Sequence, residues 1–226
     1  KDLIYDNMIQ NPVAISIKAD GTRMLLLMYQ SGIFFITSTL DLIPLDTSKS
    51  SDIKYSRNIN KPILIDGELM NIEGQYIYYA FDLLYADKSY VNEPYTTRHK
   101  LIDEFLPYNI NTNISDMKLI TLRVKSIITP STVPEFFKAI SLSLNDPLPK
   151  DGIIITHINK PYSNPVYKYK EPHMMTVDFF IGPNKTLGTF DDDDIKYHKE
   201  LVPLEIGKDV PIGTVAEFEY VNPTTW

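Results

Sequence analysis

The chain has 226 residues, enough for one large or two modest domains, and 43% of them are hydrophobic, enough for a sizeable core. It contains no cysteine, which excludes disulfides and thiolate metal sites. Its formal net charge of −7 argues against a module that clamps a nucleic-acid duplex, because such modules usually carry a basic surface.

Apolar runs in the first third of the chain predict antiparallel hairpins rather than the strand–helix alternation of a parallel sheet. Gln30-Ser31-Gly32 is typical of a hairpin turn, and the polar segment 46–60 is typical of a loop. The strands expected here are residues 13–18, 23–29, 33–38, 63–71 and 75–82.

Two helices are predicted in the middle of the chain, at about 97–106 and 132–144. Thr96 or Thr97 can cap the first helix, and Ser131 or Thr132 can cap the second. The residues expected to face the core are Leu101, Ile102, Phe105 and Leu106 in the first helix, and Phe136, Phe137, Ile140 and Leu144 in the second.

Four further strands are expected, at 117–125, 151–156, 166–170 and 175–181. From Gly182 onward, short apolar runs alternate with Gly, Pro and Asp clusters, which is typical of a small β-barrel. No apolar stretch is long enough to span a membrane, and we expect no membrane partner. The chain begins at Lys1 without a signal peptide, so we expect it to be part of a longer polypeptide.

The charged hexapeptide Lys18-Ala19-Asp20-Gly21-Thr22-Arg23 joins two of the expected buried strands. A lysine at the end of a buried strand is partly desolvated, which favours the neutral, nucleophilic amine. Gly21 allows the backbone to approach a ligand, and Arg23 offers a planar fork to phosphate or ribose oxygens. Taken alone, the hexapeptide fits a hairpin turn with solvated charges equally well.

Four more motifs carry residue types that suit nucleotide chemistry. They are Asp66-Gly67-Glu68, Phe81-Asp82-Leu83-Leu84-Tyr85, Asp151-Gly152-Ile153-Ile154-Ile155 and Lys168-Tyr169-Lys170. Carboxylates suit hard cations, a flat aromatic ring suits a base, and two lysines two residues apart on a strand face the same side. The alternative readings are a hairpin corner, a core aromatic, a strand cap and a solvated strand edge.

In this order, and followed by Thr176-Val177-Asp178-Phe179, the five motifs resemble those of the covalent nucleotidyltransferases, which are mRNA capping guanylyltransferases and ATP-dependent ligases. The Thr-Val-Asp-Phe ending is similar to the capping branch. The resemblance implies an α+β fold, with an antiparallel-sheet, ATP-grasp-like nucleotidyltransferase domain at 1–177. A partial OB-fold barrel at 178–226 would follow, and we expect the family's Arg-rich last motif to lie beyond Trp226.

The resemblance also implies a reaction and a set of site residues. Lys18 would take GMP from GTP as a covalent lysyl-N-GMP and pass it to the 5′-diphosphate end of an RNA, with Mg²⁺ or Mn²⁺ assisting. The implied nucleotide-binding residues are Arg23, Glu68, Phe81, Lys168 and Lys170, with Phe81 stacking on guanine and the two lysines contacting the α-phosphate. The implied metal-binding residues are Glu68 and Asp151.

Two alternatives stay open. An ATP-dependent polynucleotide ligase would use the same lysine with AMP, and Phe81-Asp82-Leu83-Leu84-Tyr85 fits a ligase equally well. A non-catalytic nucleotide-binding subunit could keep the fold, although the intact Lys18, Glu68 and Asp151 speak against it. The composition is similar to capping enzymes of large DNA viruses of the African swine fever or poxvirus type. That similarity implies fused triphosphatase and methyltransferase domains, and a location in the host cytoplasm, a viral factory or the virion.

Overall fold

The computed structural model describes residues 12–29, 32–45, 61–107, 109–112, 114, 117–171, 175–191, 194–198 and 211–219. The chain divides into two compact units, Lys1–Tyr169 and Lys170–Trp226, and each is described by itself. The predicted domain boundary at residue 177 falls inside strand β11 (Thr176–Ile181) of the second unit. No helix in the described ranges is long and apolar enough to cross a membrane.

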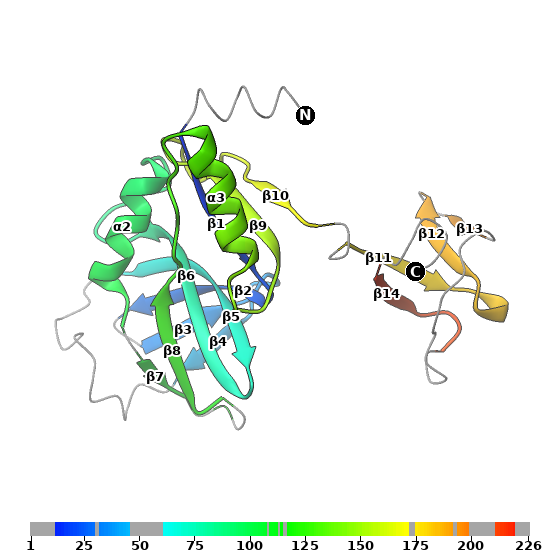
Figure 1. The fold of residues 1–226 in the computed structure, drawn as a ribbon. Helices are drawn as coiled ribbons and strands as arrows, with labels where there is room; N and C mark the ends of the chain where they lie inside the picture. Colours follow the sequence, from blue (N-terminus) through cyan, green and yellow to red (C-terminus); the bar gives the residue numbers. More distant parts are fainter. Residues whose placement is uncertain are drawn as a thin grey trace. The chain divides into compact units, whose positions relative to one another are not determined.

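The larger sheet of the first unit is formed largely by hairpins (Figure 1). Within the described residues its strand order is β4-β3-β2-β5-β6-β8-β7. The strands are β2 (Thr22–Tyr29), β3 (Gly32–Ile36), β4 (Leu42–Leu45), β5 (Ile63–Ile72), β6 (Gln75–Tyr85), β7 (Asn109–Asn111) and β8 (Leu119–Val124). The predicted turn residues Gln30 and Ser31 and the predicted loop 46–60 lie outside the described residues.

One pairing departs from the predicted antiparallel pattern, because β8 runs parallel to β6. Helix α2 (Tyr95–Phe105) lies between these two strands in the chain and allows the crossover that a parallel pair needs. The hairpin between β5 and β6 is turned by Glu73 and Gly74, both with positive φ, and the Gly74 N–H donates to Asn71 Oδ1 at 2.9 Å. The rest of the sheet is antiparallel, as predicted.

Helix α2 covers this sheet through an apolar face. Ile102 is fully buried, and Leu101, Phe105 and Leu106 pack against the same core, which confirms the predicted inward face. The predicted threonine cap is wrong: the helix begins at Tyr95 after Pro94, which makes no side-chain cap. Proline fits there because its φ is already near the helical value and its missing N–H costs nothing.

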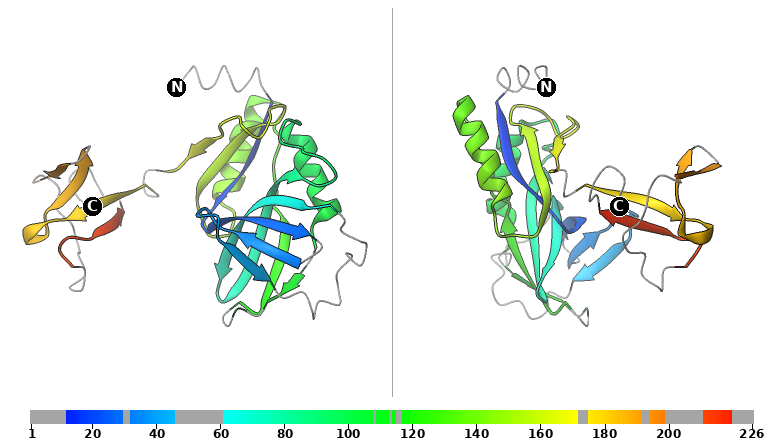
Figure 2. Two further views of the ribbon diagram at one scale, coloured as in Figure 1. Left: turned by 180° about the vertical axis from the view of Figure 1, so that it is seen from behind. Right: turned by 45° about the vertical axis from the view of Figure 1, so that its right-hand side comes forward.

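A second, three-stranded sheet of the first unit has the order β1-β9-β10, with β1 (Val13–Ala19) and β10 (Tyr167–Tyr169) flanking β9 (Lys150–His157). Helix α3 (Val133–Leu144) packs against β1 and β9 (Figure 2), where Phe136, Ile140 and Leu144 surround the buried Ala139.

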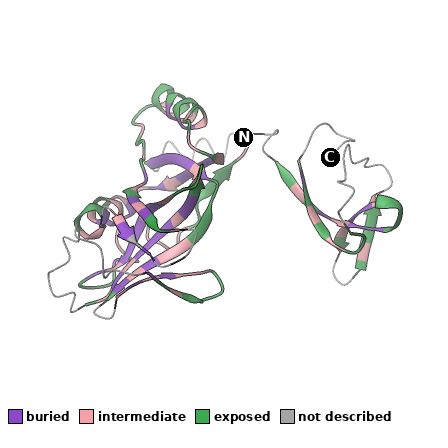
Figure 3. Cartoon of the chain, turned by 90° about the horizontal axis from the view of Figure 1, so that it is seen from below, coloured by how far each residue is buried: buried purple, intermediate pink, exposed green. Residues whose placement is uncertain are grey.

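Thr132 caps helix α3 as predicted, since its Oγ1 accepts from the Glu135 N–H at 3.4 Å. The inward placement of Phe137 is wrong, because its side chain is 56% exposed. Buried residues therefore follow the strands of this unit, while much of α3 faces solvent (Figure 3).

The second unit is a four-stranded sheet within its described residues, ordered β13-β12-β11-β14. Its strands after β11 are β12 (Leu187–Asp191), β13 (Asp194–His198) and β14 (Val215–Glu219). One face carries its core of Phe179, Ile181, Leu187 and Phe218. The predicted OB barrel stays a prediction, and Trp226 lies outside the described residues.

Candidate active site

A cavity of about 510 Å³ lies in the first unit, within the usual size range of ligand sites. Residues from both sheets of this unit line it, as does the segment that joins β9 to β10. The predicted site residues that line it are Lys18, Arg23, Glu68, Phe81 and Lys168. The fold thus brings to one cavity five side chains that are spread from residue 18 to residue 168 in the sequence.

Lys18 lies on β1 opposite a β-bulge of β9. The register pairs Ile17 with Ile153 and Ala19 with Lys150, so one residue of β1 faces two of β9. A bulge re-aims a side chain, and here Lys18 Nζ lies 2.5 and 2.6 Å from the two carboxylate oxygens of Asp151. The sequence predicted a partly desolvated lysine. The structure pairs it with a carboxylate, and both side chains are partly buried.

Arg23 uses part of its guanidinium fork within the protein. Its Nε and Nη2 lie 3.1 and 2.6 Å from the two oxygens of Asp66, a carboxylate with no solvent exposure. This hydrogen-bonded pairing raises the pKa of Arg23, which stays charged at any physiological pH. Arg23 can therefore contact a ligand only through the guanidinium N–H groups that do not bind Asp66. Its side chain is 62% exposed, so these groups are accessible.

Glu68 lies on β5, opposite Arg23 of β2. Burial raises the pKa of Glu68, while the nearby charges of Lys125 and Lys18 lower it and that of Asp151 raises it. The charge of Glu68 is therefore influenced by both members of the Lys18–Asp151 pair. No cluster of three or more His, Cys, Asp or Glu that could hold a metal occurs among the described residues. Mg²⁺ is commonly held by one or two carboxylates together with substrate phosphates, so Glu68 and Asp151 fit that mode.

Phe81 owes its direction to a second bulge. In the β5–β6 register Asp66 pairs with Asp82 and Gly67 pairs with Ala80, which leaves Phe81 as the extra residue. Its ring lines the cavity instead of joining the core. The neighbouring Tyr78 does pack in the core, as predicted, so the strand supplies both roles.

The two predicted phosphate lysines are placed differently. Lys168 lies on β10 opposite Ile154 of β9, which in turn pairs with Ser16 of β1, and all three line the cavity. Strand β10 ends at Tyr169, so Lys170 is not part of it and begins the second unit. Its predicted contact with the nucleotide stays a prediction.

Lys125 is a cavity residue that the sequence reasoning missed. It follows directly after β8 and is 3% exposed, and its ammonium lies 5.3 Å from the centre of the Phe81 ring. Burial lowers the pKa of Lys125 to about 8, against the attraction of Glu68. The available signal was a lysine at the end of an apolar strand, the same signal that singled out Lys18.

The pKa of Lys125 predicts a pH-dependent stability. An unfolded lysine titrates near 10.4, so between about pH 8 and 10.4 the unfolded chain binds more protons and stability rises with pH. Relative to Lys125→Met, the free energy of unfolding of the wild type should gain about 2–3 kcal/mol between pH 7 and 10. Urea titrations at several pH values measure this. Lys100→Met, at an exposed lysine, serves as the control. If the free energy of unfolding of the wild type rose by the same amount relative to Lys100→Met, the lowered pKa would not belong to Lys125.

A second missed element is the buried pair of Arg98 and Asp82. Arg98 Nε and Nη2 lie 2.6 and 2.8 Å from the Asp82 oxygens, and Nη1 donates to the backbone carbonyls of Glu93 and Lys160. Arg98 is 2% exposed. Its bonds tie α2 to β6, to the turn before α2 and to the segment after β9, so the pair supports the wall of the cavity.

Two solved structures share the fold: a mycobacterial DNA ligase D complexed with ATP and MES (TM-score 0.52) and the ligase domain of M. tuberculosis LigD (TM-score 0.50). Each is 15% identical, and each match covers 82% of this chain and 65% of the ligase chain. The chain has the nucleotidyltransferase fold of these ligase domains. The predicted fold of the nucleotidyltransferase part is thereby confirmed.

In sequence, the chain is similar to a probable mRNA-capping enzyme of Acanthamoeba polyphaga mimivirus, with 24% identity over 235 residues. The match covers 77% of this chain and 20% of that protein, so this chain spans about a fifth of the relative's length. No family model matches the sequence. The predicted resemblance to capping enzymes and ATP-dependent ligases is confirmed, whereas the African swine fever or poxvirus type stays a prediction.

Proposed function

We propose that the protein is an mRNA guanylyltransferase that forms a lysyl-N-GMP at Lys18. The observation that carries this proposal is the placement of Lys18 Nζ at a nucleotide-sized cavity, beside the acidic Asp151 and with Lys168 and Arg23 on the same walls. The similarity to a probable mRNA-capping enzyme supports GTP as the nucleotide and RNA as the acceptor.

In the first half-reaction the Lys18 ammonium must lose a proton before its nitrogen can attack. The Asp151 carboxylate, at 2.5 Å, is in place to accept it. The neutral nitrogen then forms a bond to the α-phosphorus of GTP, and the bond from that phosphorus to the bridging oxygen breaks, so pyrophosphate leaves with the electron pair. The nitrogen gives a second proton to solvent as the bond forms, and GMP remains on Lys18 as a phosphoramidate.

In the second half-reaction a terminal phosphate oxygen of a 5′-diphosphate RNA attacks the same phosphorus. The phosphorus–nitrogen bond breaks, the Lys18 nitrogen takes up a proton again, and the product carries a 5′–5′ linkage. The cations Lys168 and Arg23 stabilise the negative charge that gathers on the phosphoryl oxygens in both transition states.

A divalent cation, Mg²⁺ or Mn²⁺, would be held by Glu68 and Asp151 together with the nucleotide phosphates, and would neutralise phosphate charge. Asp151 can then either pair with Lys18 or bind the cation. Because the ion pair with Lys18 holds both Asp151 oxygens, we expect the pair to loosen when the nucleotide and cation bind.

Phe81 and Lys125 together support guanine over adenine. Phe81 offers a face on which either purine stacks, so it does not discriminate between them. The Lys125 ammonium beside that ring is a donor only, and guanine presents two acceptors, N7 and O6, where adenine presents N7 and an amino donor. An adenine amino group facing a buried ammonium would leave both unsatisfied.

A second candidate is an ATP-dependent polynucleotide ligase, which the two ligase structures favour. The lysine chemistry would be the same, with AMP in place of GMP. Fusion to triphosphatase and methyltransferase domains, in a viral protein acting in the host cytoplasm, remains part of the capping proposal, and the greater length of the mimivirus relative is compatible with it.

Nucleotide selection distinguishes the two candidates. With Mg²⁺ or Mn²⁺, α-labelled GTP should label the protein at least about tenfold more than α-labelled ATP, because a buried polar group left without a partner costs about 1–3 kcal/mol. The measurement is the radioactivity that stays with the denatured protein. Lys125→Met should reduce this preference for GTP. Stronger labelling by ATP would replace the guanylyltransferase proposal by the ligase.

A further inference from the structure

The segment between β9 and β10 forms one wall of the cavity. Residues 161–166 all line it, so this wall is a continuous stretch of chain. Hydrogen bonds from helix α2 and from the turn before it hold this stretch in place. The Tyr95 N–H donates to the Lys160 carbonyl at 3.2 Å, and the Tyr162 N–H donates to the Val91 carbonyl at 2.8 Å. The wall is therefore in place before any ligand binds.

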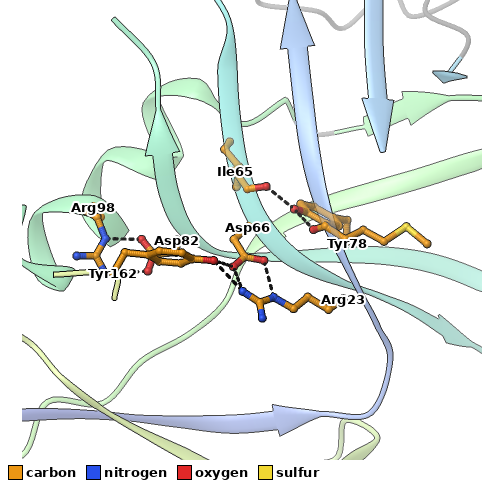
Figure 4. A network of polar contacts seen from close by, with 8 residues as sticks. Arg23, Ile65, Asp66, Tyr78, Asp82, Arg98 and Tyr162 are labelled. Atoms are coloured by element: carbon orange, nitrogen blue, oxygen red, sulfur yellow. Dashed lines mark hydrogen bonds and ion pairs between the residues drawn. The ribbon is translucent and has the colours of Figure 1, made fainter. Parts of the chain in front are cut away.

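Tyr162 links this wall to the opposite side of the cavity (Figure 4). Its hydroxyl donates to Asp66 Oδ2 at 2.7 Å and accepts from Arg23 Nη2 at 2.7 Å, while Arg23 Nη2 and Asp66 Oδ2 are 2.6 Å apart. The three groups form a closed triangle, and each group contacts both others. The phenol is fixed on its other side as well, because the Arg98 guanidinium lies 5.9 Å from the centre of its ring.

The triangle puts Tyr162 in a position to control Arg23. The Arg23 side chain is 62% exposed, and an exposed arginine has many rotamers. The buried Asp66 holds one edge of the guanidinium, and the Tyr162 hydroxyl holds the same Nη2 from the direction of the wall. Two restraints, one from β5 and one from the segment between β9 and β10, hold the guanidinium at the cavity that it lines.

We infer that Tyr162 is a positioning residue, which binds no nucleotide atom through its hydroxyl and holds Arg23 in the orientation that binds the nucleotide. This inference rests on the proposed function, in that the cavity must bind a nucleoside triphosphate. It assigns to the segment 161–166 a role in preorganising the binding site, because the hydroxyl belongs to the wall and the guanidinium to the β2 side.

A double-mutant cycle tests the inference by direct binding, which needs no turnover. The dissociation constants of GTP and of ATP are measured by calorimetry on the 226-residue protein, its Tyr162→Phe, Arg23→Ala and doubly substituted variants. Tyr162→Phe keeps the ring against Arg98 and removes only the hydroxyl. Tyr169→Phe, at an exposed tyrosine of β10, is the matched control. Arg23→Lys replaces Arg23→Ala if the alanine variant does not fold.

We expect Tyr162→Phe to weaken binding of the preferred nucleotide by about 3- to 10-fold, the usual worth of one hydrogen bond. In the Arg23 variants the same change should have almost no further effect, because Tyr162 acts through Arg23. An equal loss in both backgrounds, or no loss in the wild-type background, would overturn the inference. Failure of the wild type to bind either nucleotide would instead overturn the proposed function, and this inference with it.

Discussion

Replacing Lys18 with alanine or with arginine should abolish the covalent nucleotide adduct, lowering its rate of formation by roughly 10⁴-fold or more, as expected when a nucleophile is removed. Alanine has no nitrogen to form the bond. Arginine retains the positive charge beside Asp151, but its guanidinium does not deprotonate in proteins and cannot attack phosphorus. Labelling with α-labelled GTP followed by denaturing electrophoresis measures the adduct.

The control for Lys18 is Lys138→Ala, which removes an exposed lysine of helix α3 that does not line the cavity, and this variant should label normally. The chemistry of the bond is a second check. A phosphoramidate is cleaved by acid and by hydroxylamine and survives alkali. Labelling of either Lys18 variant at the wild-type rate, or an alkali-labile bond in the wild type, would remove Lys18 from the proposed role.

Replacing Arg98 with methionine should lower the free energy of unfolding by about 3–5 kcal/mol, the usual cost of breaking a buried ion pair. The reason is that Asp82, which is 5% exposed, would keep its buried carboxylate without the two donors at 2.6 and 2.8 Å. The Glu93 and Lys160 carbonyls would also lose a donor, so the wall segment would lose one of its ties to α2. Urea unfolding monitored by far-ultraviolet circular dichroism measures the change.

Two further variants make this test specific. Lys100→Met removes an exposed cation from the same helix and should change stability by less than about 0.5 kcal/mol. The double variant Arg98→Met with Asp82→Leu removes both charges and should recover a large part of the loss, because no buried charge is left unpaired. A loss from Arg98→Met no greater than that of the control would show that the pair is not important for stability.

The pairing of Lys18 with Asp151 changes how the nucleophile is understood. Desolvation alone, which the sequence suggested, offers no acceptor for the proton of Lys18. A carboxylate 2.5 Å from the nitrogen provides that acceptor. A nucleotide and a cation would then compete with Lys18 for Asp151.

The sequence alone determined those features that depend on neighbours in the chain. Apolar runs broken by turns specify the hairpins of the first unit, a 3.6-residue period specifies the inner face of α2, and Thr132 with Pro134 specifies the start of α3. Short motifs singled out Lys18 and Glu68, because a charge at the end of a buried strand or within it is unusual. Phe81 was singled out by the resemblance of its motif, since an aromatic ring is common in a strand.

Only the tertiary structure decided which of these groups meet, because register and bulges depend on strands far apart in the chain. Lys18 and Asp151 are 133 residues apart, and one bulge sets their contact. Arg98 looks like an ordinary surface residue in the sequence and becomes buried through packing between a helix and a sheet. Phe137 fits the apolar period of α3 yet faces solvent, because the sheet beneath that helix covers only part of the apolar surface.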